Sequence, residues 1–159
     1  MTFWHESYII GRPDEYVRDI FDIGFIDVQD GDSVFKNIQP RPFDDEFGQL
    51  ISKVFEGYEI VYNFVRMSPV FQKEPNFIHS DEMMGDITVI LYLSKNYPED
   101  DGTIFYDNND KPIFRVYSKF NTAIAFDSRI RHSRSLYHNF GEGDTSRLIQ
   151  VAFLKQKHE

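Results

Sequence analysis

The chain of 159 residues contains no cysteine. Disulfide bonds and thiolate metal sites are therefore excluded, and any bound metal must take its ligands from histidine, aspartate or glutamate. No apolar stretch approaches the roughly 20 residues that a helix needs to cross a bilayer. The first residues also lack the basic and apolar regions of a signal peptide, so we expect a cytoplasmic protein with no membrane partner.

Basic residues are scarce as well. Seventeen lysines and arginines face 26 aspartates and glutamates, which gives a formal net charge of -9. A field of that sign repels phosphate backbones, so we expect no nucleic-acid partner. Hydrophobic residues make up 41% of the chain and aromatic residues 16%, a composition typical of a packed core. We expect one domain over residues 1–159, without internal repeats.

Two helices are predicted in the first third of the chain. Apolar residues at helical spacing indicate one helix over 14–23 and another over 44–56, with Gly57 at the position of a left-handed cap. A short strand over 7–10 is expected to precede them. We interpret residues 1–57 as a helical buttress.

After Gly57 the pattern changes to short runs rich in Val, Ile, Tyr and Phe, separated by turn residues. The predicted strands cover 58–67, 76–81, 86–94, 103–107, 112–117, 122–127 and 146–154. Seven or eight short strands that follow two helices indicate an α+β, mainly β fold: a double-sheet jelly roll with the N-terminal helices packed on one sheet. The jelly-roll core is expected over 58–159.

The clearest chemical motif is His79-Ser80-Asp81. Side chains alternate along a strand, so His79 and Asp81 should share one face, which Phe77 would extend inward. Such a pair can supply two metal ligands, and a third from a distant strand would complete a site of two histidines and one carboxylate. His132, which follows the strand predicted over 122–127, is the best third ligand. An HxD triplet alone also arises by chance in unrelated proteins.

A basic residue, Arg147, begins the apolar final strand. An unpaired guanidinium would be costly on a buried face, so an anionic group should lie beside it. A ligand carboxylate would suit its planar fork. The alternatives are a structural ion pair with an acidic side chain, or a side chain that reaches water at the strand edge.

These features, in this order, resemble the 2-oxoglutarate/Fe(II)-dependent oxygenases, and above all their prolyl-4-hydroxylase-like branch. The similarity runs from about Asn76 to Leu154, and its parts are His79-Ser80-Asp81, Ile87 to Ser94, Asp101-Gly102-Thr103, Phe126-Asp127-Ser128 with His132, and Arg147. The resemblance implies a double-stranded β-helix that binds Fe(II) and 2-oxoglutarate, with ascorbate as reductant. It implies the following site residues: His79, Asp81 and His132 on iron, Arg147 on the distal carboxylate of 2-oxoglutarate, and Tyr92 in support of that carboxylate.

The chain departs from the family pattern in three places. Asp101 stands where the first glycine of a Gly-Gly pair usually falls, and Ser94 replaces the usual asparagine. Fifteen positions separate His132 from Arg147, more than is common in the family. The longer spacing indicates an inserted, turn-rich loop over 137–146.

The same spacing leaves a second interpretation open, in which His138 is the distal ligand. We prefer His132 because its distance from Phe126 and Ser128 matches the family's Phe-x-Ser-x-x-x-His spacing.

Two further arginines are candidate substrate contacts. Arg134 shares the His132 face if residues 129–134 are extended, and Arg66 lies on an earlier predicted strand. Salt bridges to the abundant acidic residues are the competing interpretation. The segments 69–75 and 97–101 are loops that we expect to cover the mouth of the pocket.

The resemblance implies a hydroxylase that acts on a small molecule, an amino acid or a peptide and releases succinate and carbon dioxide. Asp81 favours hydroxylation, because related halogenases replace that carboxylate with a small residue. The negative charge of the chain argues against a nucleobase demethylase. The alternative from another class is a non-catalytic jelly-roll module that binds a metal or a sugar.

Overall fold

The computed structural model describes residues 3–136 and 138–158. Its strands are β1 (Phe3–Ser7), β2 (Ile26–Asp30), β3 (Ser33–Pro40), β4 (Tyr58–Ser68), β5 (Ile87–Tyr92), β6 (Gly102–Tyr106), β7 (Pro112–Tyr117), β8 (Thr122–Asp127), β9 (Arg131–Arg134) and β10 (Arg147–Gln156). Two helices, α1 (Pro13–Ile23) and α2 (Glu46–Val54), and a short 3-10 turn, η1 (Gly143–Thr145), complete the described elements. Neither helix is long and apolar enough to cross a membrane.

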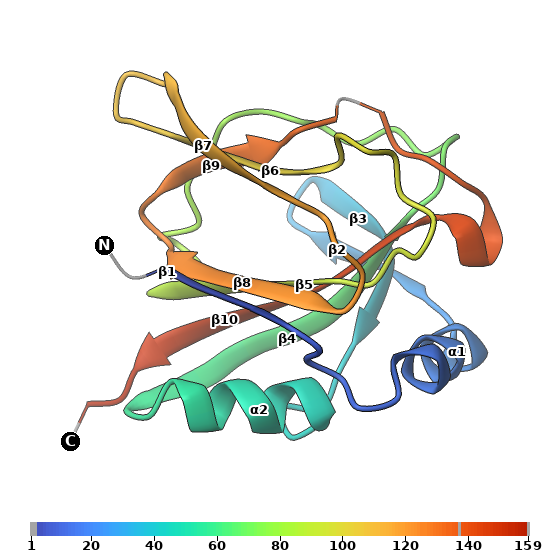
Figure 1. Ribbon diagram of the computed structural model, residues 1–159, viewed down its shortest axis with the longest axis horizontal. Helices are drawn as coiled ribbons and strands as arrows, with labels where there is room; N and C mark the ends of the chain where they lie inside the picture. The colour runs from blue at the N-terminus through green and yellow to red at the C-terminus, as the bar shows by residue number, and fades with distance from the viewer. Residues whose placement is uncertain (1–2, 137, 159) are drawn as a thin grey trace.

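The strands form two antiparallel sheets. Seven strands make the large sheet in the order β1-β8-β5-β10-β4-β3-β2, and three make the small sheet in the order β7-β6-β9. Figure 1 shows the small sheet above, the large sheet in the middle, and α1 and α2 below. The predicted α+β, mainly β jelly roll with helices on one sheet is confirmed.

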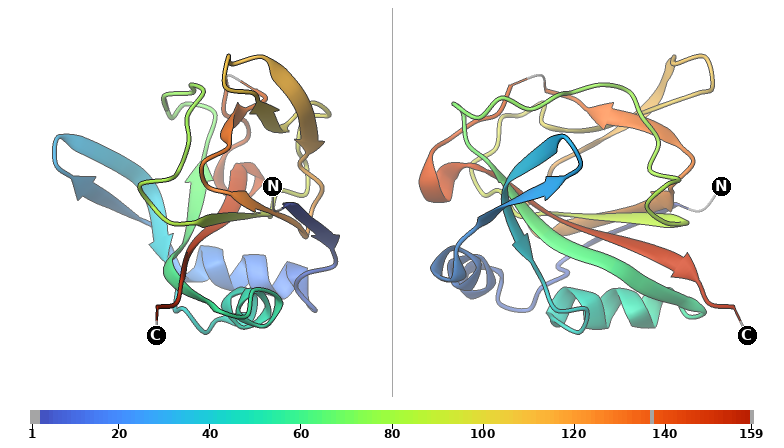
Figure 2. Two further views of the ribbon diagram at one scale, coloured as in Figure 1. Left: turned by 90° about the vertical axis from the view of Figure 1, so that its left-hand side faces the viewer. Right: turned by 180° about the vertical axis from the view of Figure 1, so that it is seen from behind.

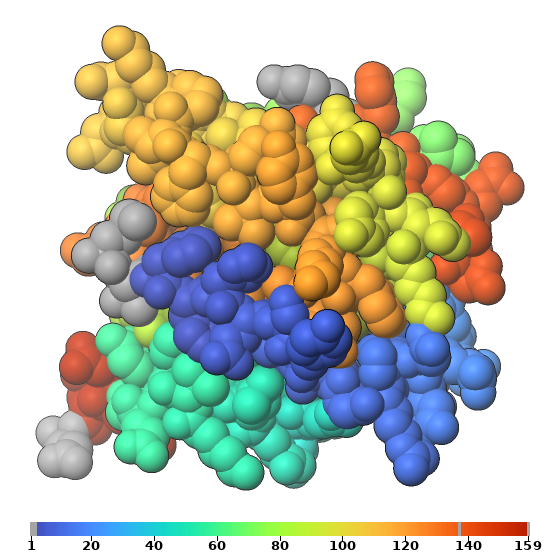
Figure 3. Space-filling model, in the orientation of Figure 1, coloured from blue at the N-terminus to red at the C-terminus, as the bar shows by residue number. Residues whose placement is uncertain are grey.

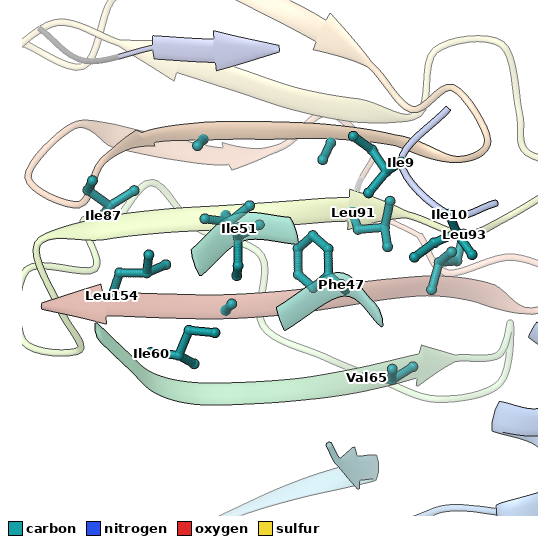
Figure 4. Close-up of a cluster of buried hydrophobic side chains, with 14 of the residues drawn as sticks. Ile9, Ile10, Phe47, Ile51, Ile60, Val65, Ile87, Leu91, Leu93 and Leu154 are labelled. Carbon is teal, nitrogen blue, oxygen red and sulfur yellow. The ribbon is translucent and has the colours of Figure 1, made fainter. Parts of the chain in front are cut away.

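The large sheet separates two apolar layers. Side chains alternate along β5, so Val89 and Leu91 face the helices whereas Ile90 and Tyr92 face the small sheet. On the helix side, Phe47 of α2 lies over the sheet among side chains of β5 and β10 (Figure 4). The other apolar layer lies between the two sheets, and its Phe126 packs against His132.

Helix α2 is fixed to the sheet by its first residues. The side chain of Asp45 caps the helix by accepting a hydrogen bond from the Gly48 N–H at 2.8 Å. The same carboxylate forms an ion pair with Arg41 at 3.0 Å, and both side chains are largely buried. Gln150 of β10 also donates to Asp45 at 3.0 Å, so the cap connects the helix to the middle of the large sheet.

The two sheets come together at β1. Phe3 of β1 packs edge-on against Phe105 of β6 and Phe114 of β7, with ring centroids 6.0 and 5.4 Å apart. In Figure 3 the blue N-terminal segment lies on the surface between α2 below and the orange β7 region above. β1 therefore closes this side of the jelly roll.

Residues 1–57, interpreted as a helical buttress, also contribute three strands to the large sheet. β1 shares only Ser7 with the strand predicted over 7–10, and β2 and β3 form a hairpin that extends the large sheet beside β4. Figure 2 shows this hairpin projecting from the body of the molecule. Most of its side chains are exposed, and a hairpin with little to bury has no clear apolar alternation to reveal it.

The predicted strand over 76–81 is also wrong. Only an isolated bridge between His79 and His132 occurs there. Phe77 is 59% exposed, so it does not extend inward as predicted, and its ring lies 5.2 Å from the His79 ring. Without a continuous ladder on both sides, the strict alternation of a strand does not apply to this segment.

Candidate metal centre

Three side chains converge at the edge of the space between the sheets: His79, Asp81 and His132. His79 and Asp81 belong to the segment between β4 and β5, whereas His132 lies in β9. The His79 N–H donates to the His132 carbonyl at 3.0 Å, and the His132 N–H donates back to the His79 carbonyl at 2.8 Å. One ligand atom from each of the three side chains lies within 4.8 Å of the others. The predicted triad is therefore assembled by a backbone pair between its two histidines.

Both imidazole rings are oriented by backbone carbonyls. Nδ1 of His79 lies 2.9 Å from the Phe77 carbonyl, and Nδ1 of His132 lies 3.0 Å from the Ile130 carbonyl. A carbonyl only accepts, so each Nδ1 donates its hydrogen to that carbonyl and each Nε2 is turned toward Asp81. The Nε2 atoms lie 3.4 and 3.1 Å from the two oxygens of Asp81. Metal-binding histidines commonly have this arrangement.

Asp81 is held through both its backbone and its side chain. Its backbone N–H donates to the Ser128 carbonyl at 2.8 Å, and Thr88 Oγ1 donates to the carboxylate oxygen Oδ2 at 3.1 Å. Burial alone would raise the pKa of Asp81, but the hydrogen bonds from His132 and His79 outweigh it and hold the pKa well below its usual range. Asp81 is therefore an anion at neutral pH, as a metal ligand must be.

The two histidines differ in exposure. The side chain of His132 is 6% exposed and its ring packs edge-on against Phe126 at 4.8 Å, whereas the side chain of His79 is 39% exposed. Its hydrogen bond with Asp81 raises the pKa of His79. The site therefore has an apolar wall behind His132 and opens to solvent on the side of His79.

The alternative ligand His138 does not join this group. It lies after β9 and is exposed, and its carbonyl accepts a hydrogen bond from Arg134 at 3.3 Å. Residue 137, the first of the predicted inserted loop, lies outside the described residues. The rest of that loop includes η1, and Gly141 accepts from the N–H of Val70 at 2.8 Å, so it packs on the segment 69–75.

Arg147 faces the space between the sheets. Leu148 belongs to the apolar layer that faces the helices, and Ile149 belongs to the layer between the two sheets. Because side chains alternate along a strand, Arg147 lies on the same face as Ile149, toward the small sheet. Its side chain is 5% exposed, and Nε lies 3.4 Å from Oδ1 of Asp101. The anion beside Arg147 in the structure is thus a protein carboxylate, the ion pair that the sequence left open as an alternative.

Tyr92 lies on the same inner face. Its hydroxyl is 2.6 Å from Thr103 Oγ1. Burial raises the pKa of Tyr92, although Thr103 and Arg147 act in the opposite direction. The phenol is therefore a neutral hydrogen-bonding group close to the Arg147 guanidinium.

Arg66 and Arg134 share one carboxylate. Their guanidinium nitrogens lie 3.1 and 3.3 Å from the two oxygens of Glu74, whose side chain is only 7% exposed. Burial would raise the pKa of Glu74, but Arg66, hydrogen bonds from neighbouring side chains, and Arg134 together lower it. Burial and the nearby Arg147 lower the pKa of Arg134 to about 10. The predicted alternative of salt bridges is therefore present for both arginines.

Three contacts of the site were not predicted from the sequence. They are the hydrogen bond from Thr88 to Asp81, the ion pairs of Glu74 with two arginines, and the ion pair of Asp101 with Arg147. Thr88 is a polar side chain within the apolar run of β5, 1% exposed, and a buried polar residue in such a run is a signal for a specific partner. Glu74 and Asp101 lie in segments read as covering loops, where a buried acidic side chain has no local signature.

The fold resembles solved structures of 2-oxoglutarate/Fe(II) oxygenases. The epimerase SnoN from nogalamycin biosynthesis, in complex with Fe3+, alpha ketoglutarate and nogalamycin RO, aligns with a TM-score of 0.65 and 14% identity over 96% of this chain and 78% of its own. A 2OG-Fe(II) oxygenase family protein from Burkholderia pseudomallei aligns with a TM-score of 0.64 and 12% identity over 99% and 86%. The viral collagen prolyl hydroxylase from Paramecium Bursaria Chlorella virus-1 gives 0.61 and 12% over 99% and 91%.

These likenesses confirm at the level of fold the resemblance inferred from the motifs. A comparison of the sequence with models of protein families gives no match, and a search of curated proteins finds none either. The donor set of two histidines and one carboxylate fits iron(II) by its chemistry.

Proposed function

We propose that the protein is an Fe(II)- and 2-oxoglutarate-dependent oxygenase in which His79, Asp81 and His132 hold the metal. The observation that carries the proposal is the convergence of their ligand atoms within 4.8 Å, with both Nε2 atoms directed at the carboxylate. Three protein ligands on one face leave coordination positions for a chelating co-substrate and dioxygen.

The charges around the site support a dicarboxylate as co-substrate. Three guanidinium groups, of Arg66, Arg134 and Arg147, face two carboxylates, of Glu74 and Asp101, which leaves one positive charge. A ferrous ion carries two positive charges, of which the Asp81 carboxylate neutralises one, so a second positive charge remains. A 2-oxoglutarate dianion would neutralise both, and an uncompensated buried charge is costly.

Each residue has a separate task in the proposed reaction. The backbone carbonyls turn Nε2 of His79 and His132 toward the position where the metal would bind, and Thr88 fixes Asp81. Arg147, assisted by Tyr92, binds the distal carboxylate of 2-oxoglutarate. Bound iron supplies dioxygen activation coupled to decarboxylation of the co-substrate to succinate and carbon dioxide.

The finer proposal is hydroxylation of an amino-acid or peptidyl side chain. Support comes from the fold likeness to prolyl hydroxylases, one of which is named for collagen. The substrate would enter from the side of the exposed His79 ring, past Phe77. Arg66 and Arg134 are proposed to contact it or to shape its pocket through Glu74.

The test is uncoupled turnover. The purified protein is incubated with Fe(II), ascorbate and 2-oxoglutarate, and succinate is measured with time. We expect succinate from the native protein and from His138→Ala, and none above background from His79→Ala or His132→Ala. A mass-shift screen of amino acids and peptides, searching for a gain of one oxygen, then tests the hydroxylation. Succinate that persists in both triad variants would reject the assignment.

A second candidate is a metal-binding module without turnover. Asp101 favours it, because a protein carboxylate already partners Arg147 and no co-substrate is required to explain the buried guanidinium. This candidate predicts metal binding without any affinity for 2-oxoglutarate.

A further inference from the structure

Arg147 is contacted by Asp101 on one side only. The contact is made through Nε, 3.4 Å from Oδ1 of Asp101. Within the part of the chain that the structure describes, the terminal nitrogens Nη1 and Nη2 donate to no protein group. A guanidinium can bind two carboxylates at once, one beside Nε and one across the end of its planar fork. The end of the Arg147 fork is therefore available for a ligand.

Asp101 itself is fixed in place. Its side chain is 1% exposed, and its second oxygen, Oδ2, accepts a hydrogen bond from Ser118 Oγ at 2.7 Å. The Ser118 N–H donates to the Asp101 carbonyl at 2.9 Å, and the Asp101 N–H donates to the Pro98 carbonyl at 3.0 Å. Ser118 therefore holds the carboxylate through Oδ2, while Oδ1 contacts Arg147.

The backbone next to Asp101 leaves no room for adjustment. At Gly102 an added Cβ would lie 2.0 Å from the Val116 carbonyl oxygen, so only glycine allows β6 to pair with β7 at this point. Asp101 is thus held beside the end of β7 and contacts the guanidinium at Nε. A carboxylate built in this way restricts the orientation of Arg147 and does not exchange with solvent.

We infer that Asp101 is a positioning residue: it holds the Arg147 guanidinium through Nε so that Nη1 and Nη2 present their fork to the distal carboxylate of a 2-oxo dicarboxylate. The inference rests on the proposed function, since 2-oxoglutarate is the ligand concerned. It also gives a physical reason for an aspartate at a position where the similar family usually has glycine. Asp101 compensates the buried charge of Arg147 before the co-substrate binds.

The test compares two 2-oxo acids that differ only at the far end. Nickel(II)-loaded protein is titrated calorimetrically with 2-oxoglutarate and with 2-oxopentanoate, which has the same chelating head but a methyl group in place of the distal carboxylate. Native protein should bind 2-oxoglutarate more tightly. In Asp101→Ala we expect the affinity for 2-oxoglutarate to fall about 10–100-fold, as when other residues that orient a ligand-binding side chain are removed. Affinity for 2-oxopentanoate should stay within about twofold of native, because its contacts avoid Arg147.

Two further variants separate orientation from charge. Asp101→Asn keeps an oxygen that accepts from Nε and an amide that can donate to Ser118, so it should retain the native preference for 2-oxoglutarate. Ser118→Ala keeps both charges but frees Oδ2, so it should lose part of that preference. If Asp101→Ala does not fold, Ser118→Ala decides the inference alone.

The possible outcomes separate the two proposals. Native protein that binds both acids equally would reject Arg147 as the co-substrate anchor, and with it the proposed function. If native protein prefers 2-oxoglutarate, the proposed function stands and the variants test Asp101. Tighter binding of 2-oxoglutarate by Asp101→Ala would show that Asp101 competes for the guanidinium, and an equal loss for both acids would show a general structural role. Either result, or an unchanged preference, overturns the inference.

Discussion

Removal of one side chain of the triad should remove most of the metal-dependent stabilisation. The variants are His79→Ala, Asp81→Ala and His132→Ala, and His138→Ala is the matched control, because His138 is exposed and lies outside the converging group. Nickel(II) is a suitable probe, since it binds nitrogen and oxygen sites more tightly than iron(II).

The expected magnitude follows from mass action. Free nickel(II) at one hundred times the dissociation constant adds about 2.7 kcal/mol to the free energy of unfolding. For a chain of this size each kcal/mol raises Tm by about 2–4 °C, so the native protein should gain about 5–10 °C. A variant that binds one hundred times more weakly is half saturated at the same metal concentration. It keeps only about 0.4 kcal/mol, which corresponds to about 1 °C.

Thermal unfolding followed by circular dichroism, with and without nickel(II), measures this difference directly. The metal-free Tm of each variant is recorded first, so that a loss of packing is not counted as a loss of metal. His138→Ala should show the full shift. A full shift in His132→Ala, or a lost shift in His138→Ala, would refute the assignment of the distal ligand.

Three further predictions concern the support of the site and the fold. Thr88→Val removes the hydroxyl that donates to Asp81, so nickel(II) affinity by calorimetry should fall about 10–100-fold, and Thr88→Ser should restore it. The hydrogen bond with Asp81 raises the pKa of His79; the metal-free Tm should therefore fall as pH rises through that raised pKa, because the stabilising charge is complete below the ordinary value of about 6.5 and is then lost. A flat profile would contradict this. Asp45→Ala removes the cap of α2 and breaks a buried ion pair, so urea unfolding should show a loss of about 3–5 kcal/mol, whereas the exposed neighbour Asp44→Ala should lose little.

Local pattern was enough to predict which three side chains converge at the candidate metal centre. The HxD motif and the distal His132 were identified because ligand types, their order and their spacing are visible in sequence. The strands β7 and β8 were predicted at their observed bounds, 112–117 and 122–127, since apolar runs between turn residues are strong signals. The convergence of His79 with His132 was expected from this pattern, although a single backbone bridge achieves it and not a continuous strand.

Pairings between distant residues could not be predicted in the same way. Asp101 and Arg147 lie 46 positions apart, and neither position has a local feature that selects the other. The β2–β3 hairpin was missed for a different reason: with most side chains exposed, it shows no apolar periodicity. Sequence patterns reveal what a segment buries, and they are silent where a segment buries little or where its partner is remote.

The contrast between a shared fold and an absent sequence match has a physical explanation in this site. The scaffold requires only that inner and outer faces alternate, which many apolar residues satisfy, so identities of 12–14% accompany TM-scores above 0.6. The rings of His79 and His132 are oriented by the backbone carbonyls of Phe77 and Ile130, and any residue at those two positions would supply such a carbonyl. Under the proposed function, specific side chains are required at His79, Asp81 and His132, and at the residues that support or anchor the site, Thr88, Asp101 and Arg147. Substitution elsewhere can therefore erase the sequence similarity while the proposed metal-binding geometry persists.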